Sequence, residues 1–208
     1  MKVAPLFAIV VCAAFSSCTP AWLPPRDAWL ARHFVIMENF EKTAYAGLRP
    51  EGKRRFQALF WEVRDPGAQD IFEERMALIS KAFRPENSSR PWDTDRGRIF
   101  LLNGPPLEII YGESLKTVSA PVSADAFEEA VDGISMESWL YLFENVFIVY
   151  RFFFRPPNEW RIGPGTYNDV LLRDLEARSR QEFFGIPDIE TYRIELEHLA
   201  AEKKKNPR

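Results

Sequence analysis

Cysteine and histidine are almost missing from this sequence. Its 208 residues include two cysteines and two histidines. Because His33 and His198 are the only imidazoles, a histidine-based metal centre is excluded, and no metal or other cofactor is expected. Cys12 and Cys18 have no further ligands nearby, so they do not form a metal pair. No cysteine follows Cys18, which excludes a disulfide or a cysteine nucleophile from the rest of the chain.

An excess of positive charge is missing as well. The chain has 27 basic and 30 acidic side chains, a net charge of −3. It has no basic stripe interleaved with aromatic residues, so nucleic acid is not expected as a partner. The composition, 46% hydrophobic and 27% charged, is typical of one globular domain with a sizeable core. The sequence also lacks a G-x-S-x-G elbow and a phosphate-binding glycine loop.

The one long hydrophobic run lies at the N-terminus. After Lys2, the segment Val3 to Phe15 is apolar apart from Pro5. A membrane-spanning helix needs about 20 such residues, so this shorter segment predicts the core of a signal peptide. The run ends in Phe-Ser-Ser-Cys at residues 15–18, which resembles a lipobox. Ordinary cleavage after a small residue is the alternative, but no Ala-x-Ala pattern stands at the right place.

The N-terminal pattern therefore predicts a lipid-anchored bacterial protein. Residues 1–17 are expected to be removed as a lipoprotein signal peptide, and Cys18 is expected to be acylated and to bind the lipid membrane. Residues 18–29 are rich in proline and predict an extended tether. Thr19, rather than aspartate, follows the acylated cysteine and favours the periplasmic face of the outer membrane as the location.

Residues 30–208 are predicted to form a single α+β domain that begins with helices. Apolar residues at helical spacing predict one helix after Asn39, ended by Pro50, and a second helix up to Pro66. A third helix is expected to start with the capping-box pattern at Asp70 and to run to Phe83.

The middle of the chain predicts an antiparallel sheet, followed by two C-terminal helices. Strands are expected at residues 98–103, 107–111, 137–143 and 146–154, the last of them covered on both faces because it is almost wholly apolar. Residues 112–133 are expected to form a long loop, and residues 158–168 are rich in turn formers. The closing helices are predicted at residues 167–180 and 188–203.

Several segments resemble the GWxTD-domain family in order and spacing. Residues 60–66, FWEVRDP, are similar to that family's "FW..RDP" segment, and residues 91–98, PWDTDRGR, to its name-giving motif with the "RGR" extension. The strand-turn pattern at 99–109 is similar to its "GPPDEI" stretch, and Glu137-Ser138-Trp139 to its later "E-x-W". The resemblance covers residues 30–154 and implies a bacterial lipoprotein, but it assigns no catalytic activity. Pro91 and Leu107 stand where the family has glycine and aspartate.

The motif residues predict a polar cluster that has two interpretations. The candidate site consists of Arg64, Asp65, Trp92, Asp93, Thr94, Asp95 and Arg96. In the structural interpretation, Thr94 or Asp95 binds the backbone N–H groups of a turn and an arginine neutralises Asp65. In the functional interpretation, Trp92, Asp95 and Arg96 line a binding groove. We expect Trp92 to be largely buried and the Arg96 guanidinium to face an aspartate.

The function predicted from the sequence is that of a binding or scaffold module for another envelope component, and a protein is expected as the partner. The alternative is an envelope hydrolase that acts through carboxylates, since the separation of paired carboxylates cannot be read from a sequence. Asp65, Asp93 and Asp95 could supply the oxygen ligands that calcium binds. Their spacing lacks a calcium-loop pattern, however, so no metal is assigned. A cleft with two unpaired carboxylates would favour the hydrolase, and carboxylates matched to arginines would favour the scaffold.

Overall fold

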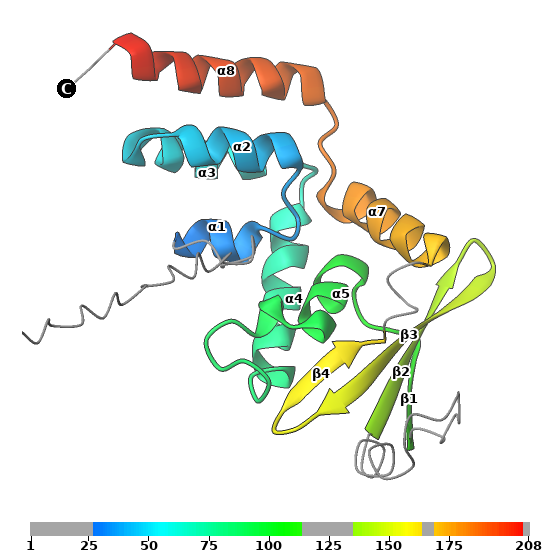
Figure 1. The fold of residues 1–208 in the computed structure, drawn as a ribbon. Coiled ribbons are helices and arrows are strands. Elements are labelled where there is room, and N and C mark those ends of the chain that lie inside the picture. Colours follow the sequence, from blue (N-terminus) through cyan, green and yellow to red (C-terminus); the bar gives the residue numbers. More distant parts are fainter. Residues whose placement is uncertain (1–26, 114–134, 164–168, 206–208) are drawn as a thin grey trace, which may run out of the picture.

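The structure is a computed structural model that describes residues 27–113, 135–163 and 169–205. The order of elements is helices, then a sheet, then helices, which confirms the predicted α+β class (Figure 1). Helices α1 (Ala28–His33), α2 (Asn39–Gly47), α3 (Pro50–Glu62) and α8 (Ile189–Lys205) lie together at one end of the molecule. Helices α4 (Ala68–Ala82), α5 (Asp95–Asn103) and α7 (Val170–Phe184) lie between that end and the sheet.

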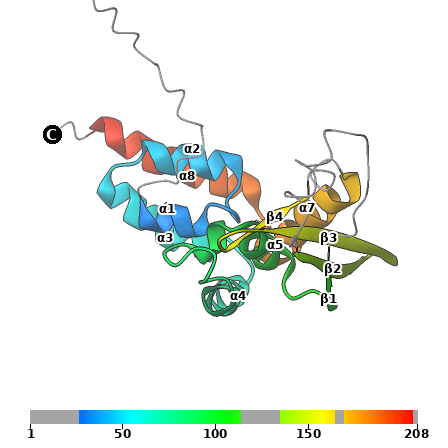
Figure 2. The same cartoon turned by 60° about the horizontal axis from the view of Figure 1, so that its bottom comes forward.

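The sheet is antiparallel and has the strand order β1-β2-β3-β4 (Figure 2). Its strands are β1 (Glu108–Glu113), β2 (Ser135–Phe143), β3 (Val146–Arg155) and β4 (Glu159–Ile162). Helices α5 and α7 cover one face, where the Tyr141 hydroxyl donates to Gly104 O at 2.9 Å and the Tyr150 hydroxyl donates to Leu172 O at 3.3 Å. Trp139 is buried on the same face, as the alternation along β2 predicted.

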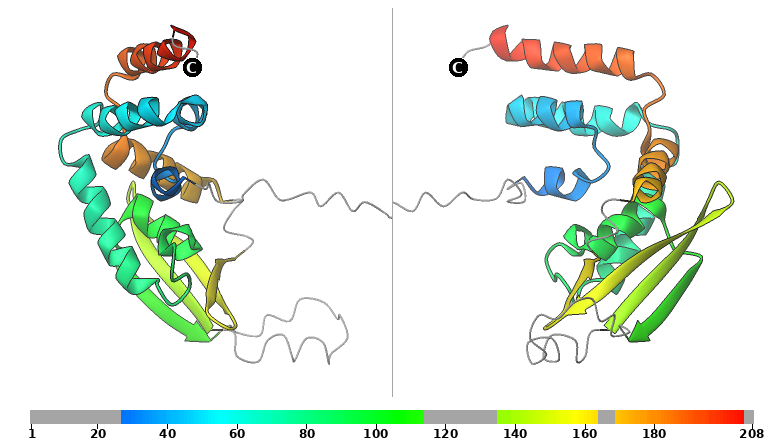
Figure 3. Two further views of the ribbon diagram at one scale, coloured as in Figure 1. Left: turned by 90° about the vertical axis from the view of Figure 1, so that its left-hand side faces the viewer. Right: turned by 45° about the vertical axis from the view of Figure 1, so that its right-hand side comes forward.

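The other face of the sheet has no helix over it in the described part of the chain (Figure 3). Leu142 and Phe147 lie opposite each other on that face and are 52% and 64% exposed. Their neighbours Tyr141 and Ile148, which point to the helices, are buried. The expectation that the 146–154 strand is covered on both faces was therefore wrong. Apart from Arg151, its apolar sequence comes from one buried face and one face that is open and largely apolar.

The largest difference from the predicted elements is at residues 98–103, which form a helix and not the expected strand. These residues form most of α5, which starts at the N-cap Thr94 and ends at Gly104, whose φ is +75°. The helix contacts α4, α7 and β4, so it is buried on most sides and reads as one continuous apolar run. A short run of this kind cannot be assigned to strand or helix from periodicity alone.

Other boundaries differ in smaller ways. β4 occupies part of the segment predicted to contain only turns, and it was missed because it is four residues long. Helix α4 begins at Ala68 after Gly67, without the predicted side-chain cap at Asp70. Helix α2 takes Glu38 rather than Asn39 as its N-cap, in a capping box with Glu41. The predicted loop at 112–133 lies mostly outside the described residues, as do the signal peptide, Cys18 and most of the tether.

Candidate functional site

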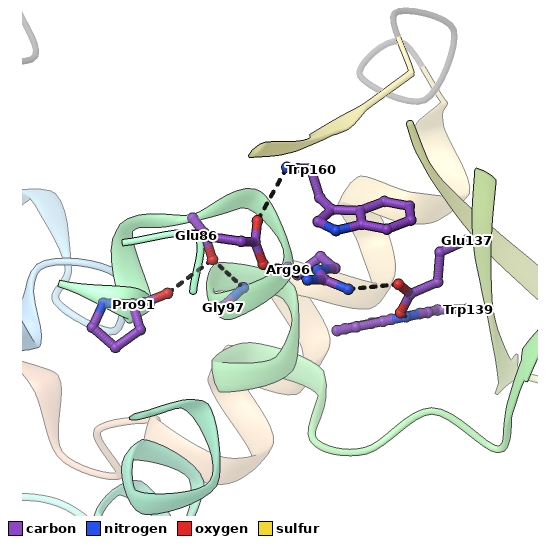
Figure 4. A network of polar contacts seen from close by, with 8 residues as sticks. Glu86, Pro91, Arg96, Gly97, Glu137, Trp139 and Trp160 are labelled. Carbon is purple, nitrogen blue, oxygen red and sulfur yellow. Dashed lines mark hydrogen bonds and ion pairs between the residues drawn. The ribbon is translucent and has the colours of Figure 1, made fainter. Parts of the chain in front are cut away.

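The polar cluster forms around Arg96, in the first turn of α5. Its guanidinium joins two glutamates (Figure 4). Arg96 Nε donates to Glu86 Oε1 at 2.8 Å, and Nη1 donates to Glu137 Oε2 at 2.5 Å. The same guanidinium carbon lies 4.9 Å from the ring centre of Phe83 and 4.7 Å from that of Trp160. Arg96 therefore connects the segment after α4 with β2 and β4 by charge and by ring contacts.

The side chains of this network are buried, so the stability of the fold depends on their pairing. The side chains of Glu86 and Glu137 are each 3% exposed, and that of Arg96 is 13% exposed. Trp139 Nε1 also donates to Glu137, so that carboxylate has a second partner. Removing one member of a buried ionic group leaves the others charged and unpaired, which is strongly destabilising.

Glu86 shows the cost of this burial. Burial raises the pKa of its carboxyl, and the Arg96 guanidinium offsets only part of that rise. Glu86 Oε2 also accepts from the Trp160 backbone N–H at 3.2 Å. The carboxylate is thus fully engaged within the fold and presents no free oxygen to a cleft.

The turn before α5 depends on Thr94 and Gly97. Thr94 Oγ1 donates to Pro91 O at 2.8 Å and accepts from the Gly97 N–H at 3.0 Å, which caps the helix (Figure 4). A Cβ atom at Gly97 would lie 2.3 Å from Pro91 O, so only glycine fits there. The predicted role of Thr94 in binding backbone N–H groups is confirmed, although it caps a helix and not a turn before a strand.

Asp95 binds the backbone of the last strand. Its Oδ2 accepts from the Ile162 N–H at 2.9 Å, and its side chain is 6% exposed. The Glu86 carboxylate binds the N–H of Trp160, two residues earlier along β4. Alternate N–H groups of an edge strand point away from the sheet, so these two carboxylates occupy the outer edge of β4.

Two other motif residues lie beside this network but are more exposed. Trp92 is partly buried against the core, and its Nε1 atom is buried without a hydrogen-bond partner among the described residues. Asp93 is exposed and pairs with Arg90 at 3.4 Å. The expectation that Arg96 faces an aspartate was wrong, because its partners are Glu86 and Glu137.

Arg64 and Asp65 do not join this cluster. Arg64 is the centre of a separate buried network, in which Nη2 donates to Glu41 at 2.9 Å and both side chains are 0% exposed. The Tyr192 hydroxyl from α8 donates to the same carboxylate at 2.9 Å. Asp65 is exposed in the turn before α4, and Arg64 pairs with Glu41, so Arg64 is not the arginine that was expected to neutralise Asp65. The motif residues therefore divide between two structural networks.

The two histidines have different environments, one buried and the other exposed. His33 is buried and stacked between Trp29 and Phe72, with ring-centre distances of 4.1 Å and 4.8 Å, and burial lowers its pKa to about 4. His198 is exposed on α8. Within residues 27–113, 135–163 and 169–205, no three His, Cys, Asp or Glu side chains are grouped to hold a metal ion.

Sequence reasoning missed the acidic partners of both arginines. Glu86 lies between the predicted third helix and the 91–98 motif, in a stretch without a motif of its own, and Glu41 lies in a helix predicted from its apolar spacing. Glu137 had a signal, because it belongs to the E-x-W segment of the family resemblance. The structure joins that segment to the 91–98 motif through the contact between Arg96 and Glu137.

The described surface also has an apolar groove of about 530 Å³ between α2 and α8. Its apolar lining comes from Phe40, Ala44, Leu196 and Ala200. Comparison of the chain with family models, curated proteins and solved structures finds no match. The GWxTD likeness therefore remains a resemblance carried by the motifs.

Proposed function

We propose that this chain is a lipid-anchored envelope protein whose α+β domain binds another envelope protein and does not catalyse a reaction. The observation that carries the proposal is that the buried carboxylates around Arg96 are all paired within the fold. Glu86 and Glu137 share Arg96, and Asp95 binds the Ile162 N–H and lies 3.9 Å from Arg98. A cluster satisfied in this way stabilises a fold that presents a surface to a partner.

The hydrolase alternative needs a different arrangement. Glycoside hydrolysis uses two carboxyl groups on either side of an open site, one of them protonated and the other free to act as base or nucleophile. Glu86 and Glu137 are instead 3% exposed and held on one guanidinium. This geometry supports the scaffold over the hydrolase.

The anchor is part of the same proposal. It is supported by the apolar segment of residues 3–15 and by the lipobox-like sequence that ends at Cys18. Among the helices that the structure describes, none is both long and apolar enough to cross a membrane. The first helix among the described residues, α1, begins at Ala28, so residues 19–27 lie between the acylated cysteine and this helix.

Membrane fractionation tests the anchor. Cys18→Ala should leave an unprocessed or soluble protein, and the wild type should carry a lipid mass on its N-terminal peptide. Cys12→Ala is the matched control and should behave as the wild type, because Cys12 is removed with the signal peptide. Wild-type membrane retention of Cys18→Ala, without a lipid mass in the wild type, would refute the anchor.

Photo-crosslinking in intact cells, followed by mass spectrometry, tests the binding function. A crosslinking residue is placed at Tyr111 on β1, at Phe147 on β3 or at Ile194 on α8, which are 72%, 64% and 54% exposed. We expect the same envelope protein to be captured from one surface and not from the others. Absence of a recurrent partner from every surface contradicts the proposal. Products released from isolated cell-wall polymer by the wild type, but not by Glu137→Gln or Glu86→Gln, would favour the hydrolase.

A further inference from the structure

The two edge strands of the sheet are protected very differently. At β4, Glu86 and Asp95 bind the N–H groups of Trp160 and Ile162, and the strand is four residues long. At the opposite edge, β1 pairs with β2 over six residues, in continuous register from Glu108↔Leu140 to Glu113↔Ser135. No described element lies beside β1 on its outer side.

The β1 edge is also unusually apolar. Leu107, Ile109, Ile110 and Tyr111 are 65%, 39%, 50% and 72% exposed. Proteins normally protect an edge strand with lysine, proline, a bulge or a covering segment. The β1 sequence EIIYGE has no lysine or proline, and its register shows no bulge. An open edge of this kind offers both backbone hydrogen bonds and apolar contacts to an added strand.

Charge determines which strand fits this edge. β1 and β2 together contain three glutamates and no basic residue. The glutamate of β2, Glu137, is buried and neutralised by Arg96, whereas Glu108 of β1 is exposed. Opposite charges on adjacent strands stabilise pairing and like charges destabilise it. The edge therefore favours an incoming strand with basic residues near its ends.

The same charges disfavour a second copy of this chain. Antiparallel pairing of β1 with β1 of another copy brings the two ends of EIIYGE together, which places glutamate against glutamate at both ends. A partner of different sequence avoids this repulsion.

We infer that β1 is the docking edge for an extended segment of the partner protein, with apolar residues at its centre and lysine or arginine at its ends. The segment adds to the sheet as a fifth strand beside β1. This inference rests on the proposed binding function and assigns its surface and the chemistry of its partner.

The test uses the full chain in detergent and a capped six-residue peptide with lysine at both ends and alternating valine and threonine between them. The controls are the same peptide with glutamate at both ends and a lysine-ended peptide that is N-methylated at its central residues. Binding is followed by the backbone amide chemical shifts of the labelled chain. We expect the lysine peptide to bind about fivefold to tenfold more tightly than the glutamate peptide at low salt, with shifts centred on β1. The N-methylated peptide should not bind.

Two variants localise the effect. Glu108→Lys should remove most of the difference in affinity between the lysine and glutamate peptides, because it reverses the charge at one end of β1 and leaves the glutamate at the other end. Ile110→Lys should weaken the lysine peptide about tenfold or more by placing a charge at the edge. Leu142→Lys is the matched control, since Leu142 is 52% exposed on the same face but belongs to β2. It should leave the affinity within about twofold.

Several results would overturn the inference. They are equal affinity for the two charged peptides, shifts located in the α2–α8 groove, or unchanged binding of the N-methylated peptide. A concentration-dependent dimer that Ile110→Lys abolishes would show that a second copy occupies the edge. If crosslinking in cells captures a partner from Ile194 and not from Tyr111, the binding function stands and the β1 assignment fails.

Discussion

The two edge strands of the sheet differ in whether their outward backbone groups are bound. An edge strand presents unpaired N–H and C=O groups, some of which are bound at β4, whereas those of β1 are open within the described part of the chain. At β4, two buried carboxylates from the segment around α5 bind the outward N–H groups of Trp160 and Ile162. At β1, four large apolar side chains remain exposed and no described element covers the strand. Asp95, one of the motif residues that first suggested a functional site, therefore helps to close one edge. The edge that remains open has no motif of its own.

This comparison also separates two kinds of acidic residue. Glu86 and Asp95 are buried and serve the fold, whereas Glu108 is exposed at the edge that we assign to a partner. The buried charges of the motif thus belong to the fold, since structural ion pairs gather charged residues in the same way as functional sites do.

The strongest expected effect is at the closed edge, in Arg96→Met. The substitution leaves Glu86 and Glu137 buried without their cation, and the free energy of unfolding should fall by about 3–5 kcal/mol. Urea denaturation measures the loss. Arg178→Met is the control, because its ion pair with Glu144 has side chains 60% and 63% exposed and should contribute at most about 0.5 kcal/mol. Equal effects of the two variants would show that the Arg96 network does not hold the edge.

Asp95→Ala should have the next largest effect. It removes the acceptor of the Ile162 N–H, and the free energy of unfolding should fall by about 1–3 kcal/mol. Hydrogen exchange at the Ile162 amide should become faster than at other β4 amides. Asp95→Asn keeps an acceptor oxygen and should lose less. Asp93→Ala is the exposed control, and unchanged exchange at Ile162 in Asp95→Ala would contradict the edge-capping role.

Glu86→Gln tests how the charge of Glu86, at the β4 edge, changes the free energy of unfolding with pH. Because burial raises the Glu86 pKa above its ordinary value of 4.5, the native state holds that proton more tightly than the unfolded chain. The stability that Glu86 contributes is therefore full below 4.5 and is lost as the pH rises through the raised pKa. The unfolding free energy of the wild type, relative to Glu86→Gln, should fall as the pH rises above 4.5. Urea titrations at several pH values measure it, and a flat or rising difference would contradict the prediction.

The smallest effect on stability is expected at the open edge. Ile110→Lys replaces a side chain that is 50% exposed, so the free energy of unfolding should change by no more than about 0.5 kcal/mol. The same variant should aggregate more slowly at high concentration, because a lysine blocks edge-to-edge pairing. Light scattering and urea denaturation give the two measurements. A large loss of stability would mean that the β1 edge is part of the core and not a free surface.

Much of the fold could be predicted because its signals are local. The helices that contain Phe56, Phe60 and Phe72 were predicted from 3.6-residue spacing, and β2 from the alternation that places Trp139 and Tyr141 on one face. The sequence predicted a strand in place of α5 and did not predict β4. Both elements are short, and their secondary structure depends on the elements that pack against them. Helix α5 is surrounded by α4, α7 and β4, and this burial hides the periodicity that would have identified it.

The sequence by itself determined the α+β order and the apolar faces of the longer helices and of β2, because each depends on residues a few positions apart. Only the tertiary structure decided which charges meet. Arg96 lies 10 positions from Glu86 and 41 from Glu137, and Arg64 lies 23 from Glu41. Contacts over such separations depend on how helices and strands pack, and no local spacing encodes them. For the same reason, the open edge at β1 became visible only when the strand order was known.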